Sequence, residues 1–414
     1  MFVLAESPVS RFSGAAMLSP MKKYLASVLF VALCAVASSR AAGLNCFEPD
    51  DTSGYSLAVA VDDAPLVHTA QVFATDPSGK ITSPKDARRQ TEAVLEKLDQ
   101  LLHTADSGLA LAAKLNVYLA RDLDLPAVRA ALAARFSGPF KPAVSFVTGA
   151  LAEPETLAAM DAVATTAPGK DGKFRIPAAL PEGIAPIAVL PAGPKLYVSG
   201  MADTNSLLPA TRATLEKLVA CIGHLGSKPE DIVQLKVFLQ PMSEVAAVRK
   251  VVADYFGGKA PPTVFVDWIS ASPVVEIEMI AAAHGETSKE TNSVSYFTPP
   301  GTTDSKVYRR VARVNHGRLV YVSGLYGEKA SDGAGQIREI FSKLGTATKQ
   351  SGSDFEHLVK ATYYVTDNDA SDKLNALRPE YYNPQRPPAA SKAKVKGVGL
   401  AGKTVTMDMI AVTK

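Results

Sequence analysis

The amino-acid sequence predicts an α+β fold made of three tandem copies of one unit, each a β-sheet with two helices on one face. The first observation is repetition, because apolar runs that start at Leu66, Leu196 and Leu319 are each followed by the same succession of patterns. The second is spacing: the helix and the strand after it keep constant offsets between copies, whereas the loop after the first strand varies in length. Three open sheets in one chain can cover one another around a pseudo-threefold axis, so we expect an intramolecular pseudo-trimer.

The pattern of one unit is clearest in copy 2. Residues that alternate between apolar and polar predict strands, and apolar residues that recur every three to four positions predict helices. The strand over 233–239 alternates as if one of its faces were covered. The predicted elements are, in order, strands at 184–190 and 196–200, a helix at 212–225, a strand at 233–239, a helix at 245–256, and strands at 263–268 and 274–280.

Composition places the chain among ordinary globular proteins. A formal charge of +3 with 21% charged residues is near neutral and includes no run of Lys or Arg, so a nucleic-acid surface is not indicated. The sequence has no phosphate loop, no dinucleotide fingerprint and no metal-ligand spacing among its cysteines and histidines, so we expect no cofactor and no metal. The repeats imply three domains, over 47–166, 167–286 and 287–414.

Residues 1–46 are typical of a secretory signal peptide preceded by an extension. Met21 and two lysines supply a basic start, an apolar stretch follows at 24–36, and small residues offer cleavage after 37 or 41. The apolar stretch is too short for a membrane span. We therefore expect export to the periplasm or the medium from a start at Met21, with no membrane attachment after cleavage. Cys221 is interpreted as a buried free thiol, or alternatively as one half of a bridge to Cys46, which an oxidising compartment permits.

Short motifs in copies 2 and 3 carry a family resemblance. Copy 2 contains LYVSG at 196–200, DIVQLKVFL at 231–239, VRKVVADYF at 248–256, APPTVFV at 260–266 and VEIEMIA at 275–281, and copy 3 contains LVYVSG and RPPAAS. With these motifs the chain resembles the Rid family, the reactive intermediate deaminases also called YjgF or L-PSP endoribonucleases. The resemblance implies a chorismate-mutase-like fold, which in that family assembles as a homotrimer.

The resemblance also implies where a site would lie. In the enzymatic members an Arg holds the substrate carboxylate, and a Glu positions the water that hydrolyses an imine or enamine, between neighbouring subunits. In copies 1, 2 and 3, the family Arg position corresponds to Val144, Thr263 and Ala390. The Cys position corresponds to Phe146, Phe265 and Lys392. The Glu position corresponds to Ala159, Glu276 and Thr406. All three copies lack the Arg, and only copy 2 keeps the Glu. We therefore expect amino-acid-derived imines to be bound poorly, because a charge-assisted contact is missing.

Glu276 is the predicted catalytic residue, in the role of the water-positioning base. The alternative is an exposed or ion-paired residue of a strand. Its neighbour Glu278 has acidic counterparts in the other copies, Asp161 and Asp408, whereas Glu276 has none. An acid repeated in every copy indicates a structural role for Glu278.

The candidate substrate-binding residues are of three kinds. Two arginines occupy the helix position where the family carries Asn, as copy 3 does at Asn375, and they are alternatively solvated helix residues. A third arginine lies near the position of a family Tyr. A hydroxyl residue followed by glycine ends the first strand, with Thr69 taken as the counterpart in copy 1, and offers backbone N–H groups to a ligand or serves a tight strand exit. The predicted set is Arg129, Arg249, Arg310, Thr263, Ser199, Gly200, Ser323 and Gly324.

Three functions remain open from the sequence. The first is a diverged deaminase-like hydrolase of a small imine or enamine, monomeric with trimer-like internal symmetry. The second is a binding or scaffold protein that holds a small ligand without turnover, as the missing Arg and Glu residues suggest. The third is an endoribonuclease, which suits a near-neutral exported protein poorly.

Overall fold

The structure is a computed structural model that describes residues 38–41, 43–167, 183–285 and 291–414. The predicted signal peptide lies almost wholly outside these residues. Cys46 and Cys221 are both buried and free, so the bridge between them is wrong and the buried thiol is confirmed. Burial raises the pKa of the Cys221 thiol to about 11, which keeps it protonated. Within the described residues, no helix is both long and apolar enough to cross a membrane.

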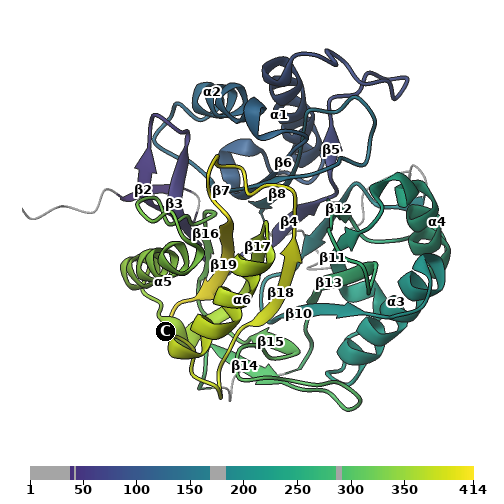
Figure 1. Cartoon of the computed structure of the whole chain (residues 1–414), viewed down its shortest axis with the longest axis vertical. Helices are drawn as coiled ribbons and strands as arrows, with labels where there is room; N and C mark the ends of the chain where they lie inside the picture. Colours follow the sequence, from purple (N-terminus) through teal and green to yellow (C-terminus); the bar gives the residue numbers. More distant parts are fainter. Residues whose placement is uncertain (1–37, 42, 168–182, 286–290) are drawn as a thin grey trace, which may run out of the picture. The chain divides into compact units, whose positions relative to one another are not determined.

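Each repeat contains two α-helices and at least four strands, which confirms the α+β fold (Figure 1). Repeat 1 and the residues before it contain β1 (Ser38–Ala41), β2 (Leu44–Asp50), β3 (Tyr55–Val61), β4 (Leu66–Thr69), β5 (Val72–Phe73), α1 (Ala87–His103), β6 (Ala112–Leu119), α2 (Leu125–Arg135), β7 (Ala143–Thr148) and β8 (Ala158–Thr165). Repeat 2 contains β9 (Ile187–Leu190), β10 (Lys195–Ala202), α3 (Leu207–Gly223), β11 (Ile232–Leu239), α4 (Val245–Tyr255), β12 (Thr263–Asp267) and β13 (Val275–Ala282). Repeat 3 contains β14 (Val294–Phe297), β15 (Val311–Val314), β16 (Leu319–Val322), α5 (Gly333–Gln350), β17 (Leu358–Val365), α6 (Asn368–Leu377), β18 (Ala389–Lys394) and β19 (Val405–Val412).

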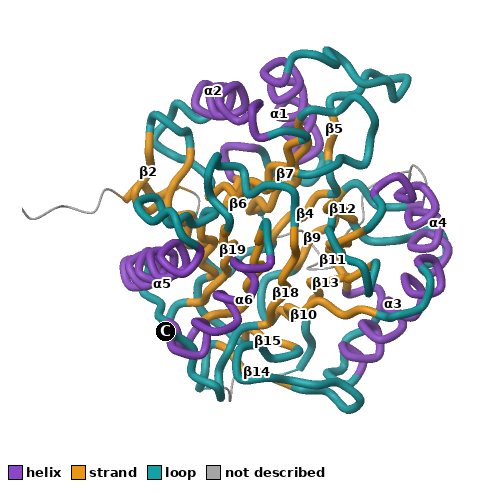
Figure 2. Tube along the Cα trace, in the orientation of Figure 1, coloured by secondary structure: helices purple, strands orange, loops and turns teal. Residues whose placement is uncertain are grey.

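The same four-strand order recurs in each repeat. In repeat 2, β11 pairs in parallel with β12 and antiparallel with β13, and β13 pairs antiparallel with β10. The helices pack on one face of these strands, because their apolar residues recur at helical spacing: Leu215, Leu218 and Ile222 of α3 are buried against β10 and β13. Figure 2 shows the strands on the inner side of the three helix pairs.

In each repeat, the strand directly before β4, β10 or β16 pairs with the sheet of a neighbouring repeat. β9 of repeat 2 pairs with β4 of repeat 1, β15 of repeat 3 with β10 of repeat 2, and β3 of repeat 1 with β16 of repeat 3. Four residues separate this strand from the next one in every copy, which allows the chain to pass from one sheet to another. The strand predicted at 184–190 therefore exists, as β9, but it extends the sheet of repeat 1 and not that of its own unit.

Each exchanged strand also touches the edge strand of its own repeat. Parallel contacts link Ser56 to Ala143 in repeat 1, and the single bridges Ile184 to Ala260 and Arg309 to Ala389 do the same in repeats 2 and 3. The hydrogen-bonded pairings thus run from repeat to repeat and return to the first.

The face of each sheet that points away from its helices is buried by the other repeats. Leu66 of repeat 1, Tyr197 of repeat 2 and Tyr321 of repeat 3 belong to one apolar cluster. A second cluster joins Trp268, the only Trp, to aromatic residues of both other repeats, among them Tyr118. The strand over 233–239 accordingly has both faces covered, and every residue of β11 is buried.

Truncating the residue that joins the repeats in this second cluster is expected to destabilise the whole protein. Trp268 is 8% exposed, and Trp268→Ala leaves a cavity between repeats, which costs about 3–5 kcal/mol. Urea unfolding followed by circular dichroism measures the change in the free energy of unfolding. The control is Leu123→Ala at a side chain that is 71% exposed, for which little change is expected. Equal effects of the two substitutions would contradict the packing role.

Candidate functional site

Strand β10 of repeat 2 meets strand β18 of repeat 3, and this contact holds the predicted catalytic residue. The Gly200 amide donates to Ser391 Oγ (3.0 Å), and the Ala390 amide donates to Ser199 Oγ (2.7 Å). Arg310 closes one side, since its Nη1 donates to the Gly200 carbonyl at 2.8 Å. Repeat 2 thus contributes a strand exit, and repeat 3 contributes a hydroxyl and a guanidinium.

Glu276 of β13 faces this contact and is half-buried. Burial raises the pKa of its carboxyl to about 7, and the neighbouring Glu278 carboxylate adds to the rise. Lys360, Arg310 and the Ser391 hydroxyl act in the opposite direction. A carboxyl with this pKa exists in both protonation states near neutral pH, as a group that accepts and returns protons requires.

Gly200 is required because the Glu276 carboxyl approaches its backbone. A Cβ on Gly200 would lie 2.0 Å from Glu276 Oε1, which no side chain can accept without moving the carboxyl. The glycine therefore leaves room for the acid, in addition to serving a strand exit. We call Glu276, Gly200, Arg310, Ser391 and Lys392 the 2–3 site.

Lys392 stands where the family carries Cys, and sequence reasoning did not select it. Its Nζ donates to Ser371 Oγ (2.8 Å) and to Asn375 Oδ1 (3.1 Å), and Arg378 Nη2 donates to the same Asn375 oxygen (2.8 Å). Burial lowers the pKa of Lys392, and the positive charge of Arg378 lowers it further. Among the described residues, no carboxylate lies within ion-pair distance of Lys392 or Arg378, so both cations rest on neutral partners.

The corresponding positions at the other two contacts are filled differently. Arg249 stacks over Phe265, 5.5 Å from the ring centroid, and its Nη1 pairs with Glu153 at 2.6 Å. Arg129 stacks over Phe146 at the same distance. The structure thus places both arginines against the phenylalanine at the Cys position, and Arg249 is neither a solvated helix residue nor beside Glu276.

The hydroxyl residues at the strand exits have a structural role. Ser323 Oγ accepts from the Val144 amide (2.8 Å) and donates to the Ser56 carbonyl (2.6 Å). Ser199 Oγ does the same with residues of repeat 3, since it also donates to the Arg309 carbonyl at 2.6 Å. Each hydroxyl therefore joins two repeats and has no donor left for a ligand.

Repeat 1 has no such hydroxyl, because the register of its first strand differs from the sequence alignment. Leu66 lies opposite Thr165 of β8, as Lys195 lies opposite Ala282 of β13. This register matches Ser199 with Ala70, so the alignment of Ser199 with Thr69 is wrong by one residue.

The remaining predicted residues lie at the contacts that have no acid at the position of Glu276. Thr263 is buried, and its hydroxyl donates to the Pro261 carbonyl at 2.9 Å. Gly324 approaches Thr406, the counterpart of Glu276, because a Cβ there would lie 3.1 Å from Thr406 Oγ1. Of the predicted set, Ser199, Gly200 and Arg310 accompany Glu276, whereas Arg129, Arg249, Thr263, Ser323 and Gly324 do not.

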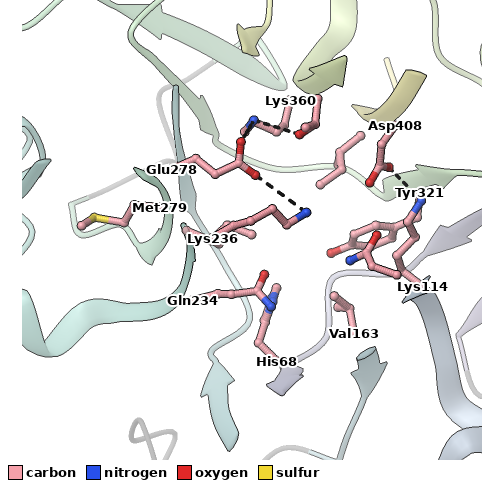
Figure 3. A pocket seen from close by; sticks show the side chains of 14 residues that line it. His68, Lys114, Val163, Gln234, Lys236, Glu278, Met279, Tyr321, Lys360 and Asp408 are labelled. Atoms are coloured by element: carbon pink, nitrogen blue, oxygen red, sulfur yellow. Dashed lines mark hydrogen bonds and ion pairs between the residues drawn. The ribbon is translucent and has the colours of Figure 1, made fainter. Parts of the chain in front are cut away.

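A buried group of charges lies where the three sheets face one another, around a cavity of about 40 Å³ (Figure 3). Lys114 Nζ donates to Asp408 Oδ1 (2.8 Å), and Lys360 Nζ donates to Glu278 Oε2 (2.6 Å), so each pair joins two repeats. Asp161 accepts from the Tyr118 hydroxyl at 2.7 Å. The structural role predicted for Glu278 and its acidic counterparts agrees with these bonds. None of the described residues forms a group of His, Cys, Asp or Glu that could hold a metal ion.

Breaking one of these buried pairs is expected to cost far more than breaking an exposed one. Asp408→Asn leaves the Lys114 ammonium buried without its carboxylate, which destabilises the fold by about 3–5 kcal/mol. The control, Asp254→Asn, breaks the exposed pair with Lys250 and is expected to change little. Urea midpoints at neutral pH compare the two, and a small loss in Asp408→Asn would show that the pair is dispensable.

Comparisons with known proteins agree with the repeated fold. The family model described as Endoribonuclease L-PSP matches residues 47–166, 188–284 and 305–413. The RutC family protein PH0854 of Pyrococcus horikoshii is 29% identical over 114 residues, which cover 24% of this chain and 90% of that protein. The Rid family protein YyfB of Yersinia pestis is 30% identical with a TM-score of 0.26, over 28% of this chain and 88% of that one. Escherichia coli TdcF with bound serine is 20% identical with a TM-score of 0.24, over 27% of this chain and 88% of that one.

Proposed function

Because the chain belongs to the L-PSP endoribonuclease family, also called Rid or YjgF, we propose that it hydrolyses a small imine or enamine at the 2–3 site. The observation that carries this proposal is the half-buried Glu276 carboxyl, which has a pKa raised to about 7 and lies near the cations Arg310 and Lys360 of the next repeat. A carboxyl of this kind is suited to general base and acid catalysis at neutral pH.

In the proposed reaction, Glu276 first acts as a base. Its carboxylate takes a proton from water while the water oxygen bonds to the imine carbon, and the C=N electron pair moves to nitrogen, which then takes this proton from Glu276. In the collapse of the carbinolamine, the Glu276 carboxylate takes the proton of the carbinol hydroxyl, the C–N bond breaks, and Glu276 passes the proton to the departing nitrogen. Imine and water are thus converted to a carbonyl compound and ammonia, and Glu276 returns to its starting state.

Lys392 and Arg310 are the groups available for an anionic part of the substrate. Lys392 has neutral partners only, and the Arg310 Nε atom is buried without a hydrogen-bond partner. A cation whose partners are neutral can accept a carboxylate without breaking an ion pair. The loss of the family Arg, at Ala390 in this repeat, is then offset by a lysine two residues further along β18.

We propose a single working site among the three contacts between repeats. The other two have Ala159 and Thr406 in place of the acid, and a phenylalanine under an arginine at each Cys position. The cyclic exchange of first strands supports an intramolecular pseudo-trimer as the arrangement that creates these contacts. Export to the periplasm or medium is also proposed, from the signal-like pattern that begins at Met21.

A non-catalytic ligand-binding protein is the second candidate. It is favoured by the absence of the family Arg from all three copies, at Val144, Thr263 and Ala390. Endoribonuclease activity finds less support, since a near-neutral chain offers RNA little charge. RNA binding that appears at low salt and vanishes as salt rises would revive that reading.

Removing the acid is expected to slow turnover strongly. With 2-iminopropionate and a panel of uncharged imines as substrates, Glu276→Gln should lower kcat/KM by about 10²–10⁴-fold, because it removes the base and keeps the shape. The wild-type rate should rise as pH increases through about 7, since the carboxyl must lose its proton before it can accept one. Glu153→Gln removes a carboxyl from a different contact and should leave the rate unchanged. Wild-type protein that turns over no imine would favour the binding-protein candidate.

Lys392 is expected to determine preference for anionic substrates. Lys392→Met should raise KM for 2-iminopropionate by about ten- to a hundredfold, because a charge-assisted contact contributes about 1.5–3 kcal/mol. KM for an uncharged imine should not change, and Lys392→Arg should restore most of the binding. An equal effect on both substrates would indicate that Lys392 supports the fold and does not bind the carboxylate.

A further inference from the structure

The central cavity has a lining rich in hydrogen-bond donors. Its volume is about 40 Å³, and side chains of all three repeats surround it. A water molecule needs about 10–15 Å³ of such space, so the cavity admits two or three waters or one small ion. The polar and charged lining residues are His68, Lys114, Asn116, Gln234, Lys236, Glu278, Tyr321, Lys360, Thr362 and Asp408.

Lys236 differs from the other two lysines in its hydrogen bonding. Lys114 donates to Ser145 Oγ, the Val322 carbonyl and Asp408, and Lys360 likewise has three acceptors. Lys236 Nζ lies 3.9 Å from Glu278 Oε1, and no acceptor among the described residues lies within hydrogen-bond distance. Figure 3 shows its amine pointing into the space between Glu278 and Tyr321. A buried ammonium without a hydrogen-bond acceptor is costly, so an acceptor inside the cavity would stabilise it.

Two further polar side chains face the cavity without hydrogen-bond partners. Both ring nitrogens of His68 and the hydroxyl of Tyr321 lack one, although the Gln234 amide and the Tyr197 hydroxyl lie near them. Burial lowers the pKa of His68 to about 4, so the ring is neutral and carries one N–H. The cavity is therefore lined by an ammonium, an imidazole N–H and a phenol O–H, three donors that have no hydrogen-bond acceptor among the described residues.

The carboxylates around the cavity are already committed to other partners. Asp408 is bound by Lys114, Glu278 by Lys360, and Asp161 by Tyr118. Burial also raises the pKa of Asp161.

We propose that this cavity binds one small monovalent inorganic anion, of the size of chloride, held by Lys236 together with His68 and Tyr321. These three residues come from repeats 2, 1 and 3, so the anion connects the three repeats at their centre. It compensates the one ammonium of the cavity that has no acceptor. The anion stabilises the folded chain, because the three groups come together only there.

The proposal is tested first by thermal unfolding at constant ionic strength, with sodium chloride replaced stepwise by sodium gluconate, whose anion is too large for the cavity. The wild-type Tm should rise by about 1–3 °C for each tenfold increase in chloride above the dissociation constant. Lys236→Met should abolish this dependence. Lys250→Met, which removes an exposed lysine, should retain it.

A crystal grown in sodium bromide provides the second measurement and does not depend on any variant folding. An anomalous peak in the cavity, within about 3.5 Å of Lys236 Nζ, is expected. Water density in the cavity without a bromide peak would overturn the proposal. A chloride dependence of Tm that is the same in Lys236→Met as in the wild type would overturn it equally, because the anion would then act elsewhere.

Discussion

The rest of the structure depends on how the second face of each sheet is covered. The two helices of a repeat bury only one face of its sheet. Leaving the other apolar face in water would cost more free energy than the whole stability of a domain of this size. One strand of each repeat, β3, β9 or β15, therefore pairs with the sheet of a neighbouring repeat. The inner faces of the sheets bury one another in shared apolar clusters. The contacts at which Glu276, Ser199 and Ser323 lie exist only because the strands are exchanged in this way.

At the contacts between repeats, the residue at the family Cys position on the strand varies together with the residue that faces it from the helix. Where β7 and β12 carry Phe146 and Phe265, the facing helix carries an arginine that stacks on the ring. Where β18 carries Lys392, the helix carries Asn375, whose oxygen accepts from the ammonium. A guanidinium facing a lysine would be repelled, and an amide facing a phenylalanine would lose its hydrogen bond. At two contacts, the arginine is therefore stacked on a phenylalanine. At the third, between repeats 2 and 3, the cations Lys392 and Arg378 contact neutral partners.

The sequence predicted most of the fold, because periodicity and repetition report burial directly. The helices predicted at 212–225 and 245–256 correspond to α3 and α4. The choice of Glu276 over Glu278 stays a prediction. Strand exchange was not predictable, because the apolar pattern of β3, β9 and β15 would be the same whichever sheet these strands joined. Lys392 was missed as a site residue because its role depends on its contacts with Asn375 and Arg378. Only the fold brings these three side chains together. The one-residue error at Thr69 arose because a hydroxyl was matched with a hydroxyl, whereas pairing follows the alternation of faces.

The centre of the molecule shows what covalent tethering permits. In a homotrimer, every residue near the threefold axis occurs three times, so a lysine there meets two identical cations. Here two lysines, Lys114 and Lys360, share one strand position, and repeat 2 carries its lysine two residues further on, at Lys236. Three acidic residues face these three lysines, and two of the pairs join different repeats. Because each copy varies alone, a substitution that helps one contact leaves the others unchanged, and a chain of three unequal repeats can keep one acid, at Glu276, while its other two contacts serve packing only.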